Sequence, residues 1–343
     1  MIRIGVIGCG YWGPNIIRNF VQMPRVEMRK VADLNVEQLN HIKCLYPTVE
    51  TTIDYKEIVT DPEIDAVAIA TPVHTHKRLA VEALENGKHV FVEKPMAGCI
   101  ADAEAMVETA KKQELQLMVG HTFEYHAAVR KMKEIIDSGL LGDIYYINCQ
   151  RLNLGIFQKD INVVWDLASH DISVVLMLLE KEPNQVMSIG TSHINPSVED
   201  VATTTLEFNN NIIAFIQTSW LDPNKVRKMT VVGSKKMLVY DDIQANEKIW
   251  IYDKGVEVPE RYDTFGEFNY SYHYGDIIIP RIENKEPLRS ELSHFIDCIE
   301  NGSRPITDGN NGLRVVKVLE AAQRSIAQGG VNVRVNSLFE HYN

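Results

Sequence analysis

Short apolar runs alternate with amphipathic stretches between Ile2 and Gly120. The runs have the length of buried strands, and the stretches between them repeat apolar residues at helical spacing. This alternation is typical of βαβ units around a parallel sheet. The expected strands are Ile2–Gly8, Val26–Asp33, Ala66–Thr71, His89–Glu93 and Leu115–Gly120, and the expected helices are Pro14–Gln22, Val36–Leu45, Thr75–Glu85 and Ala101–Gln113.

A different pattern follows His121, with longer alternating strands separated by tight turns, which predicts a largely antiparallel sheet. Asn209 to Asn211 and Gly233-Ser234 are the expected hairpin turns. The expected strands are Ile144–Asn153, Gln185–Ile194, Thr203–Phe208, Ile212–Leu221, Lys228–Val232, Met237–Tyr240 and Lys248–Tyr252. The expected helices are His126–Ser138, Val164–Leu179, Glu291–Asn301 and Gly309–Gln328.

These patterns predict an α/β protein of two domains. Residues 1–122 form a Rossmann domain with a doubly wound parallel sheet, and residues 123–343 form an α+β domain with a large, mainly antiparallel sheet. The length of 343 residues agrees, because one ordinary core does not hold a chain of that size. We expect the second domain to bind substrate and to carry the subunit contacts.

Composition narrows the class of protein. Hydrophobic residues make up 45% of the chain and charged residues 24%, as in soluble globular proteins. The formal charge of −11 repels nucleic acid and anionic membranes. The five cysteines form no C-x-x-C pair, and no apolar run is long enough to span a bilayer. We therefore expect a cytoplasmic protein with no disulfide framework, no metal site, no nucleic-acid partner and no membrane anchor.

A glycine loop follows the first expected strand and opens the first expected helix. It reads Gly8-Cys9-Gly10-Tyr11-Trp12-Gly13, the G-x-G-x-x-G spacing of a dinucleotide-binding turn. Gly8 permits the tight turn, Gly10 lets a pyrophosphate approach the backbone, and Gly13 lets the helix pack on the strand. Asp33 ends the second strand, where its carboxylate can accept hydrogen bonds from both ribose hydroxyls and would repel the 2′-phosphate of NADP. The cofactor expected is NAD.

Three further groups of residues carry candidate chemistry. Thr71-Pro72-Val73-His74 and Glu93-Lys94-Pro95 follow two strands of the parallel sheet, and ligands bind at the carboxyl ends of such strands. In the second domain, Asp166 and His170 are four residues apart and share one face of a helix.

With these motifs, the sequence resembles the glucose-fructose oxidoreductase and inositol dehydrogenase (Gfo/Idh/MocA) family along essentially its whole length. The resemblance implies that Lys94 contacts the reacting hydroxyl, that His170 is the acid–base and that Asp166 orients or charges the site. It also implies a peptide bond before Pro95 that is often cis. The cofactor-binding residues expected on this basis are Gly8, Gly10, Tyr11, Trp12, Gly13, Asp33, Thr71, Pro72, His74, Glu93 and Lys94.

The residue types suit the chemistry of alcohol oxidation. A histidine can remove the hydroxyl proton near neutral pH, and a lysine ammonium stabilises the negative charge that develops on the oxygen. His74 and His76 offer no metal site, because no cysteine or carboxylate completes a tetrahedral set. His74 is expected to line the cofactor pocket and His76 to be structural. Trp12 could lie near the cofactor or merely cover the first helix.

The motifs fix a reaction class without choosing the substrate. The short sequence segments around Trp12, Asp166 and Pro287 resemble those of nucleotide-sugar dehydrogenases of surface-polysaccharide biosynthesis. The first choice is oxidation of the C3 hydroxyl of a UDP-N-acetylhexosamine such as UDP-N-acetylglucosamine to a keto sugar. The substrate-binding residues expected are Lys94, Arg151, Asp166 and His170, and further candidate partners of a diphosphate are Lys159, Lys225, Arg227, Lys228 and Arg289.

Two other functions stay open. A dehydrogenase of free sugars or inositol would use every one of the same catalytic residues, whereas a non-catalytic NAD sensor would be expected to lack Lys94 or His170.

A run of aromatic residues could stack on a base or sugar, or lie in the subunit interface of a homodimer or homotetramer. The run comprises Tyr262, Phe265, Phe268, Tyr270, Tyr272, His273 and Tyr274.

Overall fold

The computed structural model describes residues 1–158, 161–257 and 271–335. The chain divides into two compact units, each described here by itself. The first unit combines Met1–Tyr125 with Lys285–Lys317, and the second combines His126–Asn284 with the residues from Val318 onward. The sequence-based boundary between residues 122 and 123 lies close to the first crossing between the units, but the return of residues 285–317 to the first unit was not anticipated.

The first unit is built on a six-stranded parallel sheet of order β3-β2-β1-β4-β5-β6, as in a doubly wound dinucleotide-binding fold. Its strands are β1 (Ile2–Ile7), β2 (Val26–Ala32), β3 (Glu50–Thr52), β4 (Ala66–Ile69), β5 (His89–Glu93) and β6 (Leu117–Gly120). β4 and β5 are buried along nearly their whole length, which explains why they read as continuous apolar runs. Of the strands in this sheet, only the three-residue edge strand β3 was missed in the sequence.

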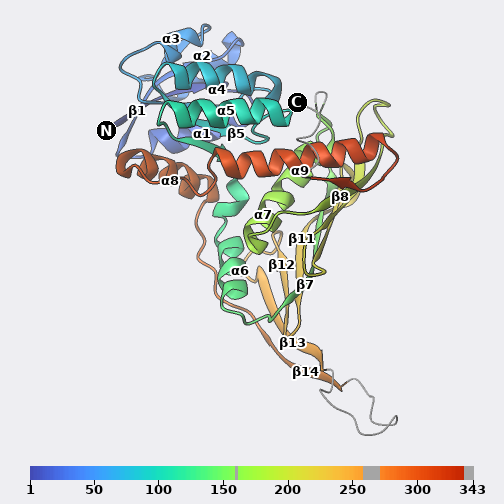
Figure 1. Ribbon diagram of the computed structural model, residues 1–343. Helices are drawn as coiled ribbons and strands as arrows, with labels where there is room; N and C mark the ends of the chain where they lie inside the picture. The colour runs from blue at the N-terminus through green and yellow to red at the C-terminus, as the bar shows by residue number, and fades with distance from the viewer. Residues whose placement is uncertain (159–160, 258–270, 336–343) are drawn as a thin grey trace. The chain divides into compact units, whose positions relative to one another are not determined.

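Helices cover both faces of this sheet. They are α1 (Gly13–Val21), α2 (Val36–Leu45), α3 (Lys56–Val59), α4 (His76–Glu85), α5 (Ile100–Lys112) and α8 (Pro287–Asn301), with short 3₁₀ turns η1 (Val73–Thr75) and η2 (Thr122–Tyr125). α4 and α5 lie side by side on one face (Figure 1). On the other face, α1 and α2 share one hydrophobic cluster with α8. Leu288, Leu292 and Phe295 supply the contribution of α8, at the spacing of one helix face.

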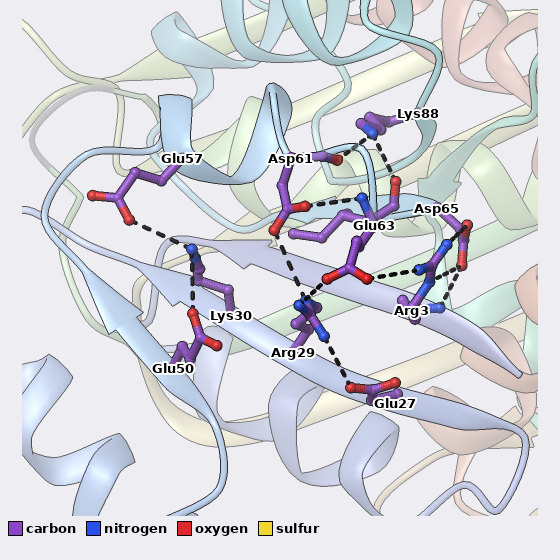
Figure 2. A network of polar contacts seen from close by, with 11 residues as sticks. Arg3, Glu27, Arg29, Lys30, Glu50, Glu57, Asp61, Glu63, Asp65 and Lys88 are labelled. Atoms are coloured by element: carbon purple, nitrogen blue, oxygen red, sulfur yellow. Dashed lines mark hydrogen bonds and ion pairs between the residues drawn. The ribbon is translucent and has the colours of Figure 1, made fainter.

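Charged side chains tie together the amino ends of the strands in the first unit, at the edge away from the glycine loop. Figure 2 shows Arg3 of β1 paired with Asp65, which directly precedes β4, at 3.1 Å between Nη2 and Oδ1. Lys88, which precedes β5, is buried and donates to the backbone oxygens of Asp61 and Ile64 at 2.6 and 2.7 Å. Most of the remaining pairs are solvent-exposed, so each contributes little to stability.

The second unit is built on a nine-stranded sheet of order β14-β13-β12-β11-β7-β10-β9-β8-β15. Its strands are β7 (Ile144–Leu154), β8 (Gln185–Thr191), β9 (Val201–Glu207), β10 (Ile213–Ser219), β11 (Leu221–Gly233), β12 (Met237–Asp241), β13 (Ile249–Glu257), β14 (Ser271–Ile278) and β15 (Val333–Arg334). The pairing is antiparallel except between β7 and β10, which run parallel. The prediction of a mainly antiparallel sheet is confirmed.

Both predicted hairpin turns are present. Asn210 and Asn211 adopt φ of 63° and 55° between β9 and β10, and consecutive positive φ values are what a two-residue type I′ turn requires. Gly233 and Ser234 turn the chain from β11 into β12, where Gly233 N–H donates to Lys236 O at 3.1 Å.

α6 (Ala127–Asp137) and α7 (Ser169–Leu179) belong to the second unit and pack on each other. α7 contacts β10, and α6 contacts β12, so both helices lie against the sheet. A one-turn π-helix, Val164–Ala168, precedes α7. The sequence indicated a single helix from Val164 to Leu179 and gave no sign of this change in winding. α9 (Gly309–Ala327) carries the chain from the first unit into the second.

Candidate active site

The glycine loop has the geometry that its spacing predicts. Gly8 has φ of +96°, and a Cβ there would lie 2.4 Å from the backbone oxygen of Ala70. A Cβ on Gly13 would lie 2.4 Å from the oxygen of Gly8, so only glycine lets α1 approach β1 this closely. A Cβ on Gly10 would meet nothing within 4 Å. The space above Gly10 is therefore open to a pyrophosphate at the start of α1.

Asp33 stands at the carboxyl end of β2, beside the loop. Its Oδ2 accepts the N–H of Cys9 at 2.7 Å, and its Oδ1 accepts the N–H of Asn35 at 2.8 Å. These two bonds fix the carboxylate while leaving lone pairs on both oxygens for ribose hydroxyls. Tyr11 and Trp12 extend from the loop with 79% and 43% of their surface exposed and contact each other edge to face. The loop and Asp33 thus fit NAD.

Asp33→Asn is expected to relax the choice between the two nicotinamide cofactors. The amide oxygen can still accept the Cys9 N–H, but the charge that repels a 2′-phosphate is gone. The ratio of kcat/KM for NADP to that for NAD should rise about tenfold or more, since about 1.4 kcal/mol corresponds to a factor of ten. Steady-state kinetics with both cofactors measures the ratio. An unchanged ratio would remove Asp33 as the selective residue.

The loops after β4 and β5 are joined by a buried histidine. The ring nitrogens of His76 lie 3.0 Å from the oxygen of Pro95 and 2.8 Å from that of Thr71. His76 is 1% exposed, which supports the structural role predicted for it. Thr71 and Pro72 precede η1, and His74 within η1 is exposed. Among the residues that the structure describes, no group of His, Cys, Asp and Glu could hold a metal ion.

Lys94 follows β5 directly, between buried neighbours. The peptide bond between Lys94 and Pro95 is cis, as the resemblance implied. Glu93 Oε2 accepts the backbone N–H of Lys94 at 3.2 Å, and the Lys94 side chain is half-buried. Burial raises the pKa of Glu93 to about 7, against the opposing effect of the Lys94 charge.

A cluster of buried ionisable groups surrounds this strand end, and only its member Glu93 was singled out in the sequence. It comprises Glu93, His121, Glu124 and Glu291. Thr122 donates to Glu291 Oε2 at 2.6 Å, and Asn311 donates to Glu124 Oε1 at 3.2 Å. Burial, with added repulsion from Glu93 and Glu124, raises the pKa of Glu291 well above its usual range. A carboxylate on the apolar face of an amphipathic helix, between Leu288 and Leu292, was the available signal.

The pKa of His121 is shifted in the opposite direction from those of Glu93 and Glu291. Burial, reinforced by the charge of Lys94, lowers the pKa of His121 to about 3. His121 therefore favours folding above pH 6.5, and this contribution is lost as pH falls toward 3. Glu93 favours folding below pH 4.5, and its contribution is lost as pH rises through 7. The two effects oppose each other between pH 4.5 and 6.5.

Substituting these two residues should tilt the stability profile in opposite directions. As pH rises from 4.5 to 6.5, the free energy of unfolding of Glu93→Gln should increase by about 2 kcal/mol relative to wild type. That of His121→Asn should decrease by about as much, since one pKa unit corresponds to 1.36 kcal/mol. Melting temperatures at pH 4.5, 5.5 and 6.5 measure the trend. The exposed Glu108→Gln on α5 is the control and should parallel wild type. Parallel profiles for all four proteins would contradict the assigned pKa shifts.

In the second unit, Asp166 lies within the π-turn and His170 within the first turn of α7. Single π-turns frequently occur at functional sites, because the extra residue re-aims the side chains that follow. Both residues are half-buried. Trp220 Nε1–H donates to Asp166 Oδ2 at 3.1 Å, a contact between residues 54 positions apart that the sequence did not indicate.

Arg151 of β7 has a partner within the protein. Its Nε and Nη2 donate to Asp171 Oδ2 and Oδ1 at 2.8 and 2.9 Å, and both side chains are about 7% exposed. This bidentate pair joins the sheet to α7. A guanidinium so enclosed is poorly placed to reach a diphosphate, so we leave Arg151 out of the substrate site.

The other candidate diphosphate partners are dispersed. Lys225 and Lys228 are exposed on β11, and Arg227 on the same strand pairs with Asp242 at 3.4 Å. Arg289 is exposed on α8 in the first unit. Tyr272, His273 and Tyr274 lie on β14. Lys159, Tyr262, Phe265, Phe268 and Tyr270 lie outside the described residues.

Comparison with known proteins identifies both parts of the chain. Residues 2–121 match the family model described as "Oxidoreductase family, NAD-binding Rossmann fold", and residues 129–239 match the model described as "GFO/IDH/MocA C-terminal domain". No helix in the described part of the chain is both long and apolar enough to cross a membrane.

Relatives cover nearly the whole chain. UDP-N-acetylglucosamine 3-dehydrogenase of Acidithiobacillus ferrooxidans is 28% identical, over 92% of this chain and 94% of its own. Myo-inositol 2-dehydrogenase of Thermotoga maritima is 23% identical, over 95% and 97%. Among solved structures, levoglucosan dehydrogenase in complex with NADH and levoglucosan superposes with a TM-score of 0.83 at 21% identity, over 97% of this chain and 99% of that one.

Proposed function

Because the chain belongs to the Gfo/Idh/MocA family of NAD-binding oxidoreductases, we propose that it oxidises a secondary hydroxyl of a nucleotide-linked sugar, with the C3 hydroxyl of UDP-N-acetylglucosamine as first candidate. The observation that carries the dehydrogenase assignment is the presence in one chain of an open glycine loop, Lys94 at the carboxyl end of β5, Asp166 in the π-turn and His170 in the first turn of α7. NAD, when bound, supplies the acceptor for the hydride.

Each residue has a distinct part in the proposed reaction. Lys94 binds the hydroxyl oxygen and stabilises the negative charge that develops on it. His170 takes the hydroxyl proton, and the Asp166 carboxylate stabilises the charge that His170 acquires. Gly8, Gly10, Gly13 and Asp33 hold the diphosphate and ribose, with Tyr11, Trp12, Thr71, Pro72, His74 and Glu93 around the remainder of the cofactor. In the first unit, the Glu93 carboxylate accepts the backbone N–H of Lys94 and so helps to fix the position of Lys94.

The relatives act on two classes of substrate. The UDP-N-acetylglucosamine 3-dehydrogenase named above is 28% identical over 327 residues, and the myo-inositol 2-dehydrogenase is 23% identical over 338 residues. Oxidation of free sugars or inositol is therefore the second candidate. Retention of both Lys94 and His170 argues against a non-catalytic NAD sensor. A homodimer or homotetramer remains a prediction, to be checked by mass in solution.

A substrate screen distinguishes the candidates. Purified protein is incubated with NAD and a panel of UDP-sugars, free sugars and inositols, and NADH formation is followed at 340 nm. Turnover of UDP-N-acetylglucosamine well above that of N-acetylglucosamine would support the nucleotide-sugar assignment. Turnover of unlinked polyols alone would replace it with the second candidate. No turnover of any panel member, despite bound NAD, would contradict both.

A further inference from the structure

Trp220 is held rigidly in the second unit, at the junction of β10 and β11. Its side chain is buried, with 1% of the residue exposed. Its backbone N–H donates to the backbone oxygen of Asp200 at 2.9 Å, and its backbone oxygen accepts the N–H of Gly155 at 3.0 Å. Its ring contacts Phe157 at 5.5 Å between centroids, and a Cβ on Gly155 would lie 2.9 Å from its Cδ1. The indole therefore has little freedom to turn.

The one polar atom of this buried ring points at a residue of the proposed active site. Indole Nε1–H can only donate, and a buried donor requires an acceptor. The acceptor is the carboxylate of Asp166, at 3.1 Å. A hydrogen bond to a carboxylate is roughly twice as strong as one between neutral groups.

A separate set of contacts fixes the backbone at this point. Asn162 is 6% exposed, and its Oδ1 accepts the N–H of Trp165 at 3.1 Å. Its Nδ2 donates to Glu199 and Gln323, each at 2.7 Å. These contacts hold the π-turn but do not touch the Asp166 carboxylate. Trp220 supplies a contact to the side chain itself.

From this geometry we propose that Trp220 is a positioning residue for catalysis: its indole N–H holds the Asp166 carboxylate in the orientation that supports proton transfer at His170. The inference rests on the proposed function. It extends that function by giving an activity role to a buried aromatic residue outside the recognisable motifs.

The decisive variant replaces the indole N–H without changing the shape of the side chain. Incorporation of 3-benzothienylalanine at position 220 by amber suppression exchanges N–H for sulfur and keeps the packing against Phe157. With the substrate identified by the screen, kcat should fall about tenfold to hundredfold, the loss of a charged hydrogen bond, while the KM for NAD stays unchanged. In an Asp166→Ala background, which leaves the indole N–H without this acceptor, the same replacement should have little further effect.

A packing control separates positioning from support of the fold. Phe157→Leu disturbs the same ring but retains the N–H, so it should lower the melting temperature with kcat within about threefold of wild type. If the benzothienyl variant instead keeps wild-type kcat, Trp220 only fills the core and the proposal is overturned.

A spectroscopic test needs no substrate. The ¹⁵N–¹H signal of the Trp220 indole, assigned by its loss in Trp220→Phe, should move in Asp166→Asn while those of Trp12 and Trp250 stay in place. An unmoved Trp220 signal would refute the contact whatever the enzyme turns over. A moved signal together with inactivity toward every panel substrate would count against the proposed function and leave the contact established.

Discussion

Lys94→Met should lower kcat by about 10²- to 10³-fold while NAD binding is retained. Removal of a single group that stabilises charge on a reacting oxygen typically has an effect of this size. Methionine is unbranched, resembles the aliphatic stem of lysine and carries no charge, so the loop after β5 should keep its fold. Steady-state kinetics gives kcat, and titration of nicotinamide binding by calorimetry gives the affinity.

A lysine elsewhere in the first unit provides the control. Lys111 is exposed near the end of α5, and Lys111→Met should leave kcat unchanged. If Lys94→Met retained a rate near that of wild type, the catalytic assignment of Lys94 would be wrong. If it lost NAD binding together with activity, Lys94 would serve the cofactor rather than the reacting hydroxyl.

Asp171→Ala should destabilise the second unit by about 3–5 kcal/mol. The substitution leaves the guanidinium of Arg151 buried without its bidentate partner, and an uncompensated buried charge is among the most costly defects in a core. Chemical denaturation followed by far-ultraviolet circular dichroism measures the loss. The melting temperature should fall in parallel.

The paired substitution Arg151→Met/Asp171→Leu tests the cause. It removes both charges and fills a similar volume, so it should recover most of the lost stability. A double variant as unstable as Asp171→Ala would show that packing at this position, and not the unpaired charge, determines the cost.

The sequence predicted features that depend on local spacing. The glycine loop, Asp33 and the asparagine hairpin turn each lie within a few residues of the element that they shape, so their backbone requirements could be inferred in advance. The parallel and antiparallel sheets followed from the period of apolar residues. The family assignment rested on short motifs of the same kind and is confirmed.

Features that depend on distant residues could not be predicted. Arg151 looked like a free cation because its partner Asp171 lies on another element. Trp220 and Asp166 are far apart in sequence, and the π-turn that presents Asp166 leaves no local signature. The burial of His121 and Glu291 likewise depends on how α8 packs against η2, the turn that follows β6, which hydrophobic periodicity alone does not reveal.

The return of α8 to the first unit has a consequence for biosynthesis. Phe295 of α8 packs against Phe91 of β5, so the hydrophobic cluster of the NAD-binding unit contains residues from both ends of the chain. A ribosome releases the glycine loop and the parallel strands first, yet α8, the last of the helices that cover this sheet, emerges only after β7 to β14 have been made. The unit that begins the polypeptide is therefore completed late, and its nascent sheet face is a natural client for chaperones until then.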